Sequence, residues 1–254
     1  LSIRRQRQMC IRDRFEGSEY LSDIFEYRLA AISSNHDIKP EDLIREEVTV
    51  TINTRHKVSF HGFINTFSYG EMQAHNMREY RFTMVPWLWF LSKTENRRIF
   101  QNKNTKDIVS QIFSDLGFKD FEFKAQGGVA REYCVQYGES DFDFVSRLLE
   151  EEGIAYYFKQ AAKKHTLVLV DQKNAYETCA DTNLTYSRGT TPDNQITRWN
   201  HNYELRKGVW TLNDYNFKEP GKSQLAEART TSKFANVTNS VSYTHLRAHE
   251  TKAN

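Results

Sequence analysis

The sequence predicts a mainly β fold with an α+β middle region. Aromatic residues make up 13% of the 254-residue chain, with 13 Tyr and 17 Phe, and flat side chains of this kind pack well on a pleated sheet. Apolar and polar residues alternate in several segments of the first third of the chain, which is typical of strands with one buried face. Two segments with helical periodicity follow. We therefore expect an antiparallel β-barrel domain, an α+β insert with a capped helix, and the start of another β domain.

Residues 15–91 predict the barrel domain. Four alternating segments indicate an antiparallel sheet that curls into a small barrel. These segments are Phe25–Ala31, Val48–Ile52, Val58–Ile64 and Tyr80–Met84. The polar segment Tyr69–Met77 is expected to form a hairpin loop. Because Pro86 suits the first turn of a helix, Trp87–Leu91 predicts a short helix whose aromatic side chains plug the barrel.

Residues 92–194 predict the α+β region, which begins with a capped helix. Asn104 and Asp107 have the spacing of a helix cap, and Gly117 is placed to end the helix. The expected buried stripe consists of Ile108, Val109, Ile112, Phe113 and Leu116. A strand is expected at Phe121–Ala125. These residues together predict one helix docked on a sheet.

The stretch Arg131–Phe158 combines a strand, a second capped helix and another strand. Tyr133–Tyr137 alternates like a strand with one buried face. Ser140 and Asp143 predict a variant of the capping box at the start of the helix. Phe142, Val145, Leu148 and Leu149 are expected to be buried, and Asp143, Ser146, Arg147 and Glu150 exposed. Gly153 supplies the left-handed residue that ends the helix.

The rest of the chain predicts a hairpin, a linker and a second β domain. Ile154–Phe158 is expected to pair with Thr166–Val170 across a two-lysine turn. Residues 171–194 are rich in Asn, Thr, Asp and Gly, which indicates a linker. In residues 195–240, the alternating segments Trp199–Leu205 and Val209–Tyr215 predict a hairpin that opens another sheet. The start of a second β domain is therefore expected here, and it is truncated.

The two ends, residues 1–14 and 241–254, differ in pattern from the sequence between them. They resemble translated adapter sequence at the ends of open reading frames from environmental sequencing, so we expect both to be foreign to the fold. The net charge of the chain is +2. Residues 1–14 hold five Arg against one Asp, and residues 241–254 hold two basic residues against one Glu. The remainder is therefore slightly acidic, which gives little support to nucleic-acid binding.

The composition also bears on compartment. Cys134 and Cys179 lie far apart without metal-ligand spacing, so buried free thiols in a reducing cytoplasm are expected. No metal or cofactor motif is found. The longest apolar-rich run, Met84–Leu91, is much shorter than the ~20 residues of a membrane span. No signal peptide is recognisable, so we expect no membrane insertion, and export would need another route.

Carboxylates gather around the second helix and suggest two interpretations. Pairs among Glu139, Asp141 and Glu151 could perform acid–base chemistry on sugars, as in an enzyme that acts on peptidoglycan. Carboxylates at a helix start also match the helix dipole, however, and glutamates near a helix end usually face solvent. Arg147 is expected to form a surface ion pair with Glu150 or Glu151, or to bridge subunits. We favour the structural interpretation, with no catalytic residue.

The stretch from Cys134 to Phe158, CVQYGESDFDFVSRLLEEEGIAYYF, resembles the VgrG family, the spike proteins of type VI secretion, which are related to the baseplate hubs of contractile phage tails. The PWLWFL element at Pro86 and the segment RRIFQNKNTKDIVSQIF resemble the same family. The matching motif residues are Tyr133, Gln136, Tyr137, Ser140, Asp141, Phe142, Arg147, Glu150 and Gly153. The resemblance covers roughly residues 15–239.

The resemblance implies a non-enzymatic hub at the base of a homotrimeric spike. In that family each chain contributes two similar barrels, so that three chains match a hexameric, Hcp-like tube protein. Baseplate components are implied as further partners, and so are a tip protein and effectors bound through C-terminal parts. The implied location is cytoplasmic during assembly, followed by export through the machine. A phage or prophage baseplate hub remains the alternative of the same class, and the carbohydrate-acting enzyme that of another.

Overall fold

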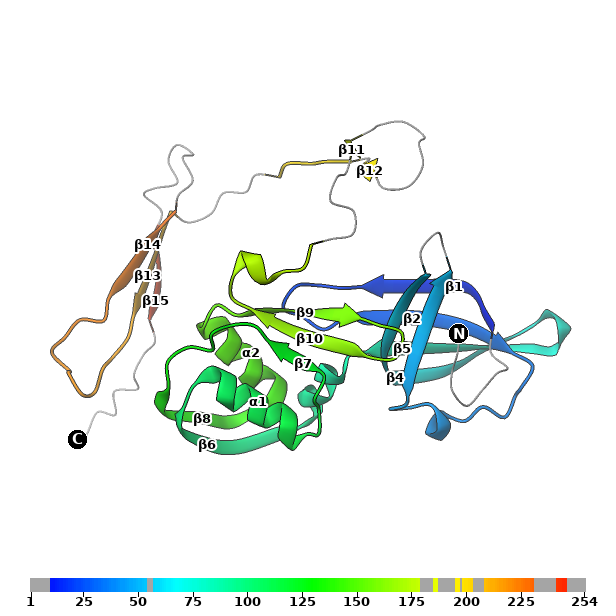
Figure 1. Cartoon of the computed structure of the whole chain (residues 1–254), viewed down its shortest axis with the longest axis horizontal. Coiled ribbons are helices and arrows are strands. Elements are labelled where there is room, and N and C mark those ends of the chain that lie inside the picture. Colours follow the sequence, from blue (N-terminus) through cyan, green and yellow to red (C-terminus); the bar gives the residue numbers. More distant parts are fainter. Residues whose placement is uncertain are drawn as a thin grey trace. The chain divides into compact units, whose positions relative to one another are not determined.

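The computed structural model describes residues 10–53, 57–178, 185–186, 195–196, 198–202, 208–230 and 241–245. The chain divides into two compact units, with the division after Thr178 (Figure 1). The first unit holds a curled β-sheet and an α+β region. The second unit holds the short strands of the C-terminal part.

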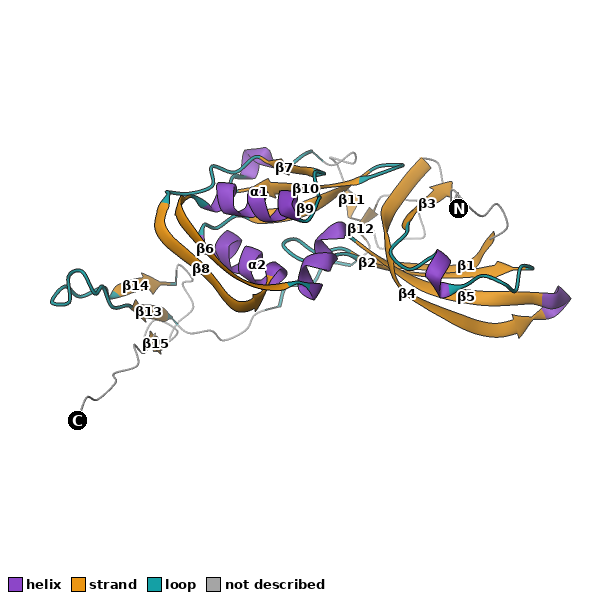
Figure 2. Cartoon of the chain, turned by 90° about the horizontal axis from the view of Figure 1, so that it is seen from below, coloured by secondary structure: helices purple, strands orange, loops and turns teal. Residues whose placement is uncertain are grey.

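The curled sheet has five antiparallel strands and forms half of a barrel (Figure 2). Its members are β1 (Cys10–Ser18), β2 (Glu26–Ser33), β3 (Glu47–Asn53), β4 (Lys57–Gln73) and β5 (Met77–Val85), in the order β1-β2-β5-β4-β3. The four predicted strands are confirmed, and β1 adds a fifth. Residues 10–14, which we expected to be foreign to the fold, belong to β1, and Arg14 pairs with Ala30 of β2.

The alternating pattern of these strands explains their core. Tyr27, Leu29 and Ala31 of β2 point to the buried face, as do Tyr80 and Phe82 of β5. The residues between them face solvent, which is the period of two expected for a strand. The sheet therefore buries one face and leaves the other polar.

The predicted hairpin loop at Tyr69–Met77 is shorter in the structure. Strand β4 continues to Gln73, and a single turn of 3-10 helix, η2 (Ala74–Asn76), connects it to β5. His75 and Asn76 adopt positive φ angles of 63° and 56°. Another short turn, η1 (Pro40–Asp42), precedes β3. The end of β4 and the start of β5 project into solvent and are therefore polar. For this reason their composition resembled that of a loop in the sequence analysis.

The α+β region contains two helices, five strands and two 3-10 helices. In chain order these are η3 (Trp87–Lys93), β6 (Glu95–Lys103), α1 (Thr105–Asp115), β7 (Phe121–Phe123), β8 (Arg131–Ser140), α2 (Asp141–Glu151), β9 (Ala155–Gln160), β10 (His165–Val170) and η4 (Lys173–Ala175). Strands β7, β10 and β9 form one sheet, and β6 pairs with β8 in another. The predicted pairing of β9 with β10 is confirmed.

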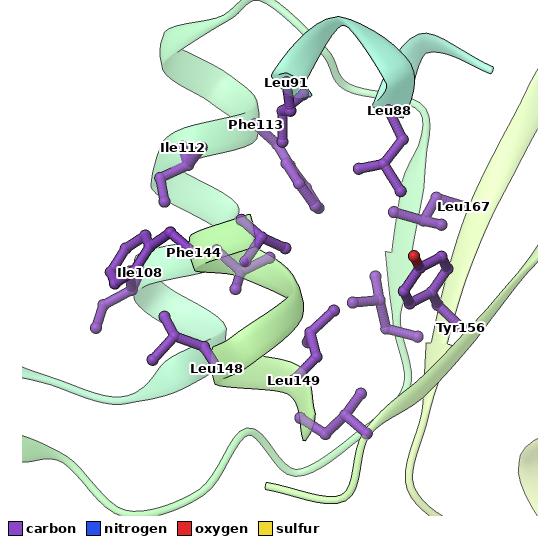
Figure 3. Packing of buried hydrophobic residues seen from close by; sticks show 14 of the residues in the cluster. Leu88, Leu91, Ile108, Ile112, Phe113, Phe144, Leu148, Leu149, Tyr156 and Leu167 are labelled. Carbon is purple, nitrogen blue, oxygen red and sulfur yellow. The ribbon is translucent and has the colours of Figure 1, made fainter. Parts of the chain in front are cut away.

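Both helices pack their apolar stripes into one core (Figure 3). On α1, Ile108, Val109, Ile112 and Phe113 are buried as predicted, and Leu116 is half-buried. The side chain of Asn104 accepts from the Asp107 N–H at 2.8 Å, and Gly117 has a φ of +83°. Leu167 and Tyr156 approach the helices from β10 and β9 (Figure 3). The helix start, stripe and stop predicted for α1 are therefore confirmed.

The predicted plug of the barrel is wrong. The segment after Pro86 does form a short helix, η3, but Trp87, Leu88 and Leu91 are buried in the core of the α+β region. Trp87 contacts Phe113 of α1 at a ring distance of 5.0 Å. The apolar composition of these residues predicts that they are buried. The sequence does not show in which core, because the core of the curled sheet and that of the α+β region are both rich in aromatic residues.

The second unit contains two short sheets. Strands β11 (Thr185–Tyr186) and β12 (Gln195–Ile196) pair in parallel. Strand β13 (Val209–Asn213) pairs antiparallel with β14 (Ala226–Arg229) and in parallel with β15 (Val241–His245). The predicted strand at Val209–Tyr215 is confirmed as β13, but its hairpin partner is β14. The described part of the predicted strand Trp199–Leu205, residues 199–202, contains no strand, and the rest lies outside the described residues.

Candidate functional site: the β8–α2 motif and the open sheet edges

The motif that carries the resemblance forms β8, α2 and the turn into β9. Along β8, Cys134 and Gln136 are buried, whereas Tyr133 and Tyr137 are 56% and 76% exposed. Cys134 is a free thiol, as predicted, and its burial raises its pKa. The alternation of this strand is therefore confirmed, with the two tyrosines on its outer face.

The outer face of the β6–β8 pair carries exposed apolar side chains. Arg97 of β6 lies opposite Tyr137 in the register, and its guanidinium is 5.4 Å from the centre of the tyrosine ring. Ile99 is 61% exposed and lies opposite Val135. Exposed apolar patches of this kind often mark surfaces for protein contacts.

Asp141 is the buried centre of the motif. Its side chain is fully buried. Its carboxylate accepts hydrogen bonds from Thr94 Oγ1 at 2.7 Å and from Gln136 Nε2 at 2.7 Å. Asn96 Nδ2 and Arg98 Nη2 donate to it at 3.2 Å. A buried carboxylate requires such donors because burial removes its hydration. Asp141 therefore ties the start of α2 to β6 and β8.

Asp141 lies in the first turn of α2, where its charge matches the helix dipole as expected, but the sequence analysis did not foresee this network. A detectable signal was present at the start of β6, where polar donors recur at every second residue: Thr94, the extended residue just before the strand, and then Asn96 and Arg98. Residues two apart in a strand share a face, so these three donors converge on one acceptor. Sequence reasoning missed them because the acceptor lies more than 40 residues further along the chain.

Ser140 caps α2 as predicted. Its hydroxyl accepts from the Asp143 N–H at 3.0 Å and donates to the Asp143 carboxylate at 2.6 Å. The Asp143 carboxylate thus binds the hydroxyl, whereas the predicted capping box directs it to a backbone N–H. The burial of α2 also differs from the prediction, because Phe144 is fully buried and Phe142 is half-buried. Ser146 and Arg147, which were expected to be exposed, are half-buried as well.

Replacement of the cap residue is expected to have a moderate effect. Ser140→Ala removes the acceptor of the Asp143 N–H and should lower the free energy of unfolding by about 1 kcal/mol. Ser140→Asn keeps a side-chain acceptor and should restore most of the loss. Urea denaturation of the two variants checks this expectation, and equal stabilities for Ala and Asn would contradict a capping role.

Arg147 joins β8 to α2. Its Nη2 lies 2.7 Å from Glu139 Oε1 and donates to the Val135 carbonyl at 3.3 Å. The predicted pair with Glu151 is present at 3.5 Å. The hydrogen bond with Glu139 raises the pKa of Arg147. Sequence spacing along one helix pointed to Glu151 but gave no sign of Glu139, which is the closer partner and lies on the strand.

The remaining motif residues have local roles. Glu150 is exposed on α2. Gly153 has a φ of +67°, which side-chain-bearing residues rarely adopt, and its N–H donates to the Glu150 carbonyl at 3.1 Å. The prediction that Gly153 ends the helix is confirmed.

Most carboxylates around α2 form ion pairs with arginines or accept hydrogen bonds from neighbouring side chains. Glu151 pairs with Arg131 at 2.5 Å, and Glu152 pairs with the same guanidinium at 2.8 Å. Burial acts against the charge of Arg131, but its hydrogen bonds with these glutamates give a net rise in its pKa. A general acid needs a proton and access to substrate, whereas Asp141 is enclosed among donors. Asp141 is therefore unsuited to act as a general acid, and Glu139 and Glu151 are both paired with Arg147.

Two surface cavities lie elsewhere in the described part of the chain. One cavity, of about 810 Å³, lies on the polar face of the curled sheet. Arg28 and Arg81, which line it, are paired with neighbouring glutamates. The other, of about 460 Å³, borders His61, Trp87 and His165. The described residues contain no group of three or more His, Cys, Asp or Glu side chains that could hold a metal ion. Nor do they include a helix long and apolar enough to cross a membrane.

The curled sheet ends in two open edges. Strands β1 and β3 are the outermost strands of the five, so each has a described partner on one side. The free backbone N–H and C=O groups of an edge strand can pair with another chain. Together with the outer face of β6 and β8, these edges are the surfaces suited to assembly.

Comparison with known proteins places this fold. Residues 18–253 match the family described as phage tail baseplate hub (GPD). The type VI secretion system spike protein VgrG1c of Pseudomonas aeruginosa is 39% identical over 215 residues, which are 82% of this chain and 30% of that protein. The actin cross-linking toxin VgrG1 of Vibrio cholerae is 32% identical over 85% of this chain and 21% of its own length. The chain thus spans a third or less of these relatives.

Solved structures agree with this placement. An Escherichia coli protein described as a component of the type VI secretion system, similar in structure to T4 bacteriophage tail proteins gp27 and gp5, superposes with a TM-score of 0.61 at 29% identity. The match covers 67% of this chain and 51% of that one. A tail protein from Neisseria meningitidis shares the fold with a TM-score of 0.61 at 13% identity, over 91% of this chain and 65% of its own. This chain therefore belongs to the phage tail baseplate hub family and is similar, within it, to the VgrG spike proteins of type VI secretion.

Proposed function

We propose that this chain is part of the hub at the base of a type VI secretion spike. The observation that carries the proposal is the half-barrel sheet with open edges at β1 and β3, found in a sequence 39% identical to a spike protein. Three copies of a chain that presents two such barrels would offer six similar edges to a six-fold tube. The β strands of the second unit would supply the start of the second barrel.

The proposed partners follow from this arrangement. They are two further copies of the chain, a hexameric Hcp-like tube protein below the hub, and baseplate components around it. A tip protein and effectors would bind through C-terminal parts of the spike. The protein would assemble in the cytoplasm and leave the cell with the spike. The role is structural, since the carboxylates around α2 are engaged with Arg131, Arg147 and the donors around Asp141.

A phage or prophage tail hub is the alternative within the same family. The fold alone does not separate the two, because it is shared with the Neisseria meningitidis tail protein at 13% identity. The identities of 39% and 38% to two Pseudomonas aeruginosa spike proteins favour the secretion machine. The genes that flank this one provide a simple check, because tube, sheath and membrane-complex genes of a secretion system differ from those of a phage.

Assembly is the direct test. The protein at its natural length, co-expressed with the tube protein of the same genome, is expected to give a complex of three hub chains on one tube ring in native mass spectrometry. A variant with Glu139→Gln and Glu151→Gln should assemble in the same way and show the same absence of peptidoglycan hydrolysis. A stable monomer that does not bind the ring would contradict the hub. Hydrolysis that the double variant abolishes would contradict the structural role.

A further inference from the structure

Two histidines meet where the curled sheet contacts the α+β region. His61 lies on β4 and His165 begins β10, and they are 4% and 1% exposed. Their Nδ1 atoms are 3.0 Å apart. The backbone N–H of Trp87 donates to Nε2 of His165 at 3.0 Å. A chain of hydrogen bonds therefore runs from the first residue of η3 through β10 to β4.

The donors and acceptors of this chain fix both tautomers. Because the Trp87 N–H can only donate, Nε2 of His165 must carry a lone pair. The ring proton of neutral His165 is then on Nδ1 and is donated to His61. Nδ1 of His61 must accept this proton, so its own proton is on Nε2. That atom faces the Glu47 carboxylate at 3.9 Å.

One more proton cannot enter this chain without breaking it. If Nδ1 of His61 is protonated, two N–H groups face each other at the 3.0 Å contact with His165. If Nε2 of His165 is protonated, the conflict lies at the Trp87 N–H instead. Both arrangements leave a buried donor without an acceptor, which costs the desolvation of that donor. Protonation and the intact chain of hydrogen bonds therefore exclude each other.

The surroundings leave little to compensate a positive charge. The rings of Phe25, Phe63 and Phe158 meet the His165 ring edge-on, with centroids 5.4, 6.1 and 5.8 Å away. Carboxylates and cations line the solvent side of the pair. They are Glu47 on β3, Arg45 before it, Lys119 and Asp120 before β7, and Lys163 and Lys164 in the β9–β10 turn. The 460 Å³ cavity that these residues line gives protons access from solvent.

We propose that His61, His165 and the Trp87 N–H form an acid-sensitive latch between the curled sheet and the α+β region. The latch is closed when both imidazoles are neutral. Uptake of a single proton opens it, either between β4 and β10 or between β10 and η3. Other contacts across the same junction remain, such as the bond from the His61 N–H to Gln160 Oε1 at 2.9 Å. Opening is therefore local and does not require the unit to unfold.

The direction of the pH dependence follows from burial. Burial, together with the neighbouring His61 ring, lowers the pKa of His165 to about 3. Burial also lowers the pKa of His61, against the attraction of Glu47 and Asp120. Once the latch is open, the histidine that takes up the proton reaches water and its pKa returns to about 6.5. The latch therefore stabilises the junction fully above about pH 6.5. This stabilisation is lost as the pH falls from about 6.5 towards the lowered pKa values that the two histidines have in the closed latch.

The tautomers provide the first test. Long-range ¹H–¹⁵N spectra of the full chain with ¹⁵N-labelled histidine, recorded at neutral pH, should show His165 protonated on Nδ1 and His61 protonated on Nε2. In the variant His165→Gln, the signals of the His165 ring should be absent, which identifies them in the spectrum of the unmodified chain. Protonation of His165 on Nε2 would overturn the latch, since the Trp87 N–H would then have no acceptor there.

Hydrogen exchange at Trp87 provides the second test. If opening admits one proton, the protection factor of the Trp87 amide should fall about 30-fold between about pH 7.5 and about pH 5, beyond the change in intrinsic exchange. The amide of Ile112 in α1 reports on the core of the α+β region and should change less. An equal change at both amides would overturn local opening.

A variant without titratable groups completes the test. In His61→Asn with His165→Gln, the amide oxygens replace the two acceptor nitrogens, so Trp87 keeps an acceptor and the pair cannot be protonated. The additional pH dependence of Trp87 protection should disappear. If it persists, other groups cause it and the latch is wrong. The tautomer measurement on the unmodified chain decides the matter even if this variant does not fold.

Discussion

Asp141→Asn is expected to lower the free energy of unfolding by about 3 kcal/mol, because it removes the charge that pairs with Arg98 inside the protein. The amide that replaces one carboxylate oxygen would place a donor among the donors of Thr94, Asn96 and Gln136. Arg98 is 23% exposed and can recover some hydration, so we expect the lower end of the range known for broken buried pairs. Urea denaturation followed by tryptophan fluorescence measures the change.

Glu150→Gln is the matched control for this change. It neutralises a carboxylate of the same helix that is exposed to solvent. Surface substitutions of this type usually change stability by less than about 0.5 kcal/mol. Similar losses for Asp141→Asn and Glu150→Gln would mean that net charge on α2 matters and the buried network does not.

Phe113→Ala is expected to lower the free energy of unfolding by about 3–5 kcal/mol through loss of buried contacts and the cavity left behind. The Phe113 ring is fully buried and contacts Trp87 and Phe121 at 5.0 and 5.1 Å. It therefore links α1 to η3 and β7, and Figure 3 shows it pointing between the elements of this core. Thermal and urea unfolding measure the effect.

Tyr133→Ala serves as the control for ring loss. Its side chain is 56% exposed on the outer face of β8, so its removal should change monomer stability by less than about 0.5 kcal/mol. A large loss at Tyr133, or a small one at Phe113, would contradict the division between core and surface described above.

The sequence predicted the elements best where the relevant contacts are local. The cap at Asn104, the stripe of α1 and the stop at Gly117 depend on residues within one or two turns of each other, and all three are confirmed. Strand alternation predicted β2 to β5 for the same reason. The pairing of β9 with β10 could be predicted from the sequence because a short turn joins the two strands.

Long-range contacts explain what the sequence did not predict. Asp141 at a helix start is compatible with a dipole role, and its burial depends on donors from Thr94, just before β6, and from Asn96 and Arg98 of β6. The side chains of η3 could have joined either aromatic core. His61 and His165 are 104 residues apart, and no spacing rule brings two single histidines together. The sequence thus predicted the strand and the capped helix that carry the motif residues, but not the partners of Asp141.

Phe158 is half-buried and packs against the cores of both the curled sheet and the α+β region. Its ring meets Phe25 of the sheet at 5.0 Å and Tyr156 on its own strand at 6.3 Å. A side chain shared in this way couples the melting of the two cores, since neither can lose its packing without exposing part of the other. The first unit should therefore unfold in one cooperative transition. A force applied to one of the two cores would likewise be borne by both.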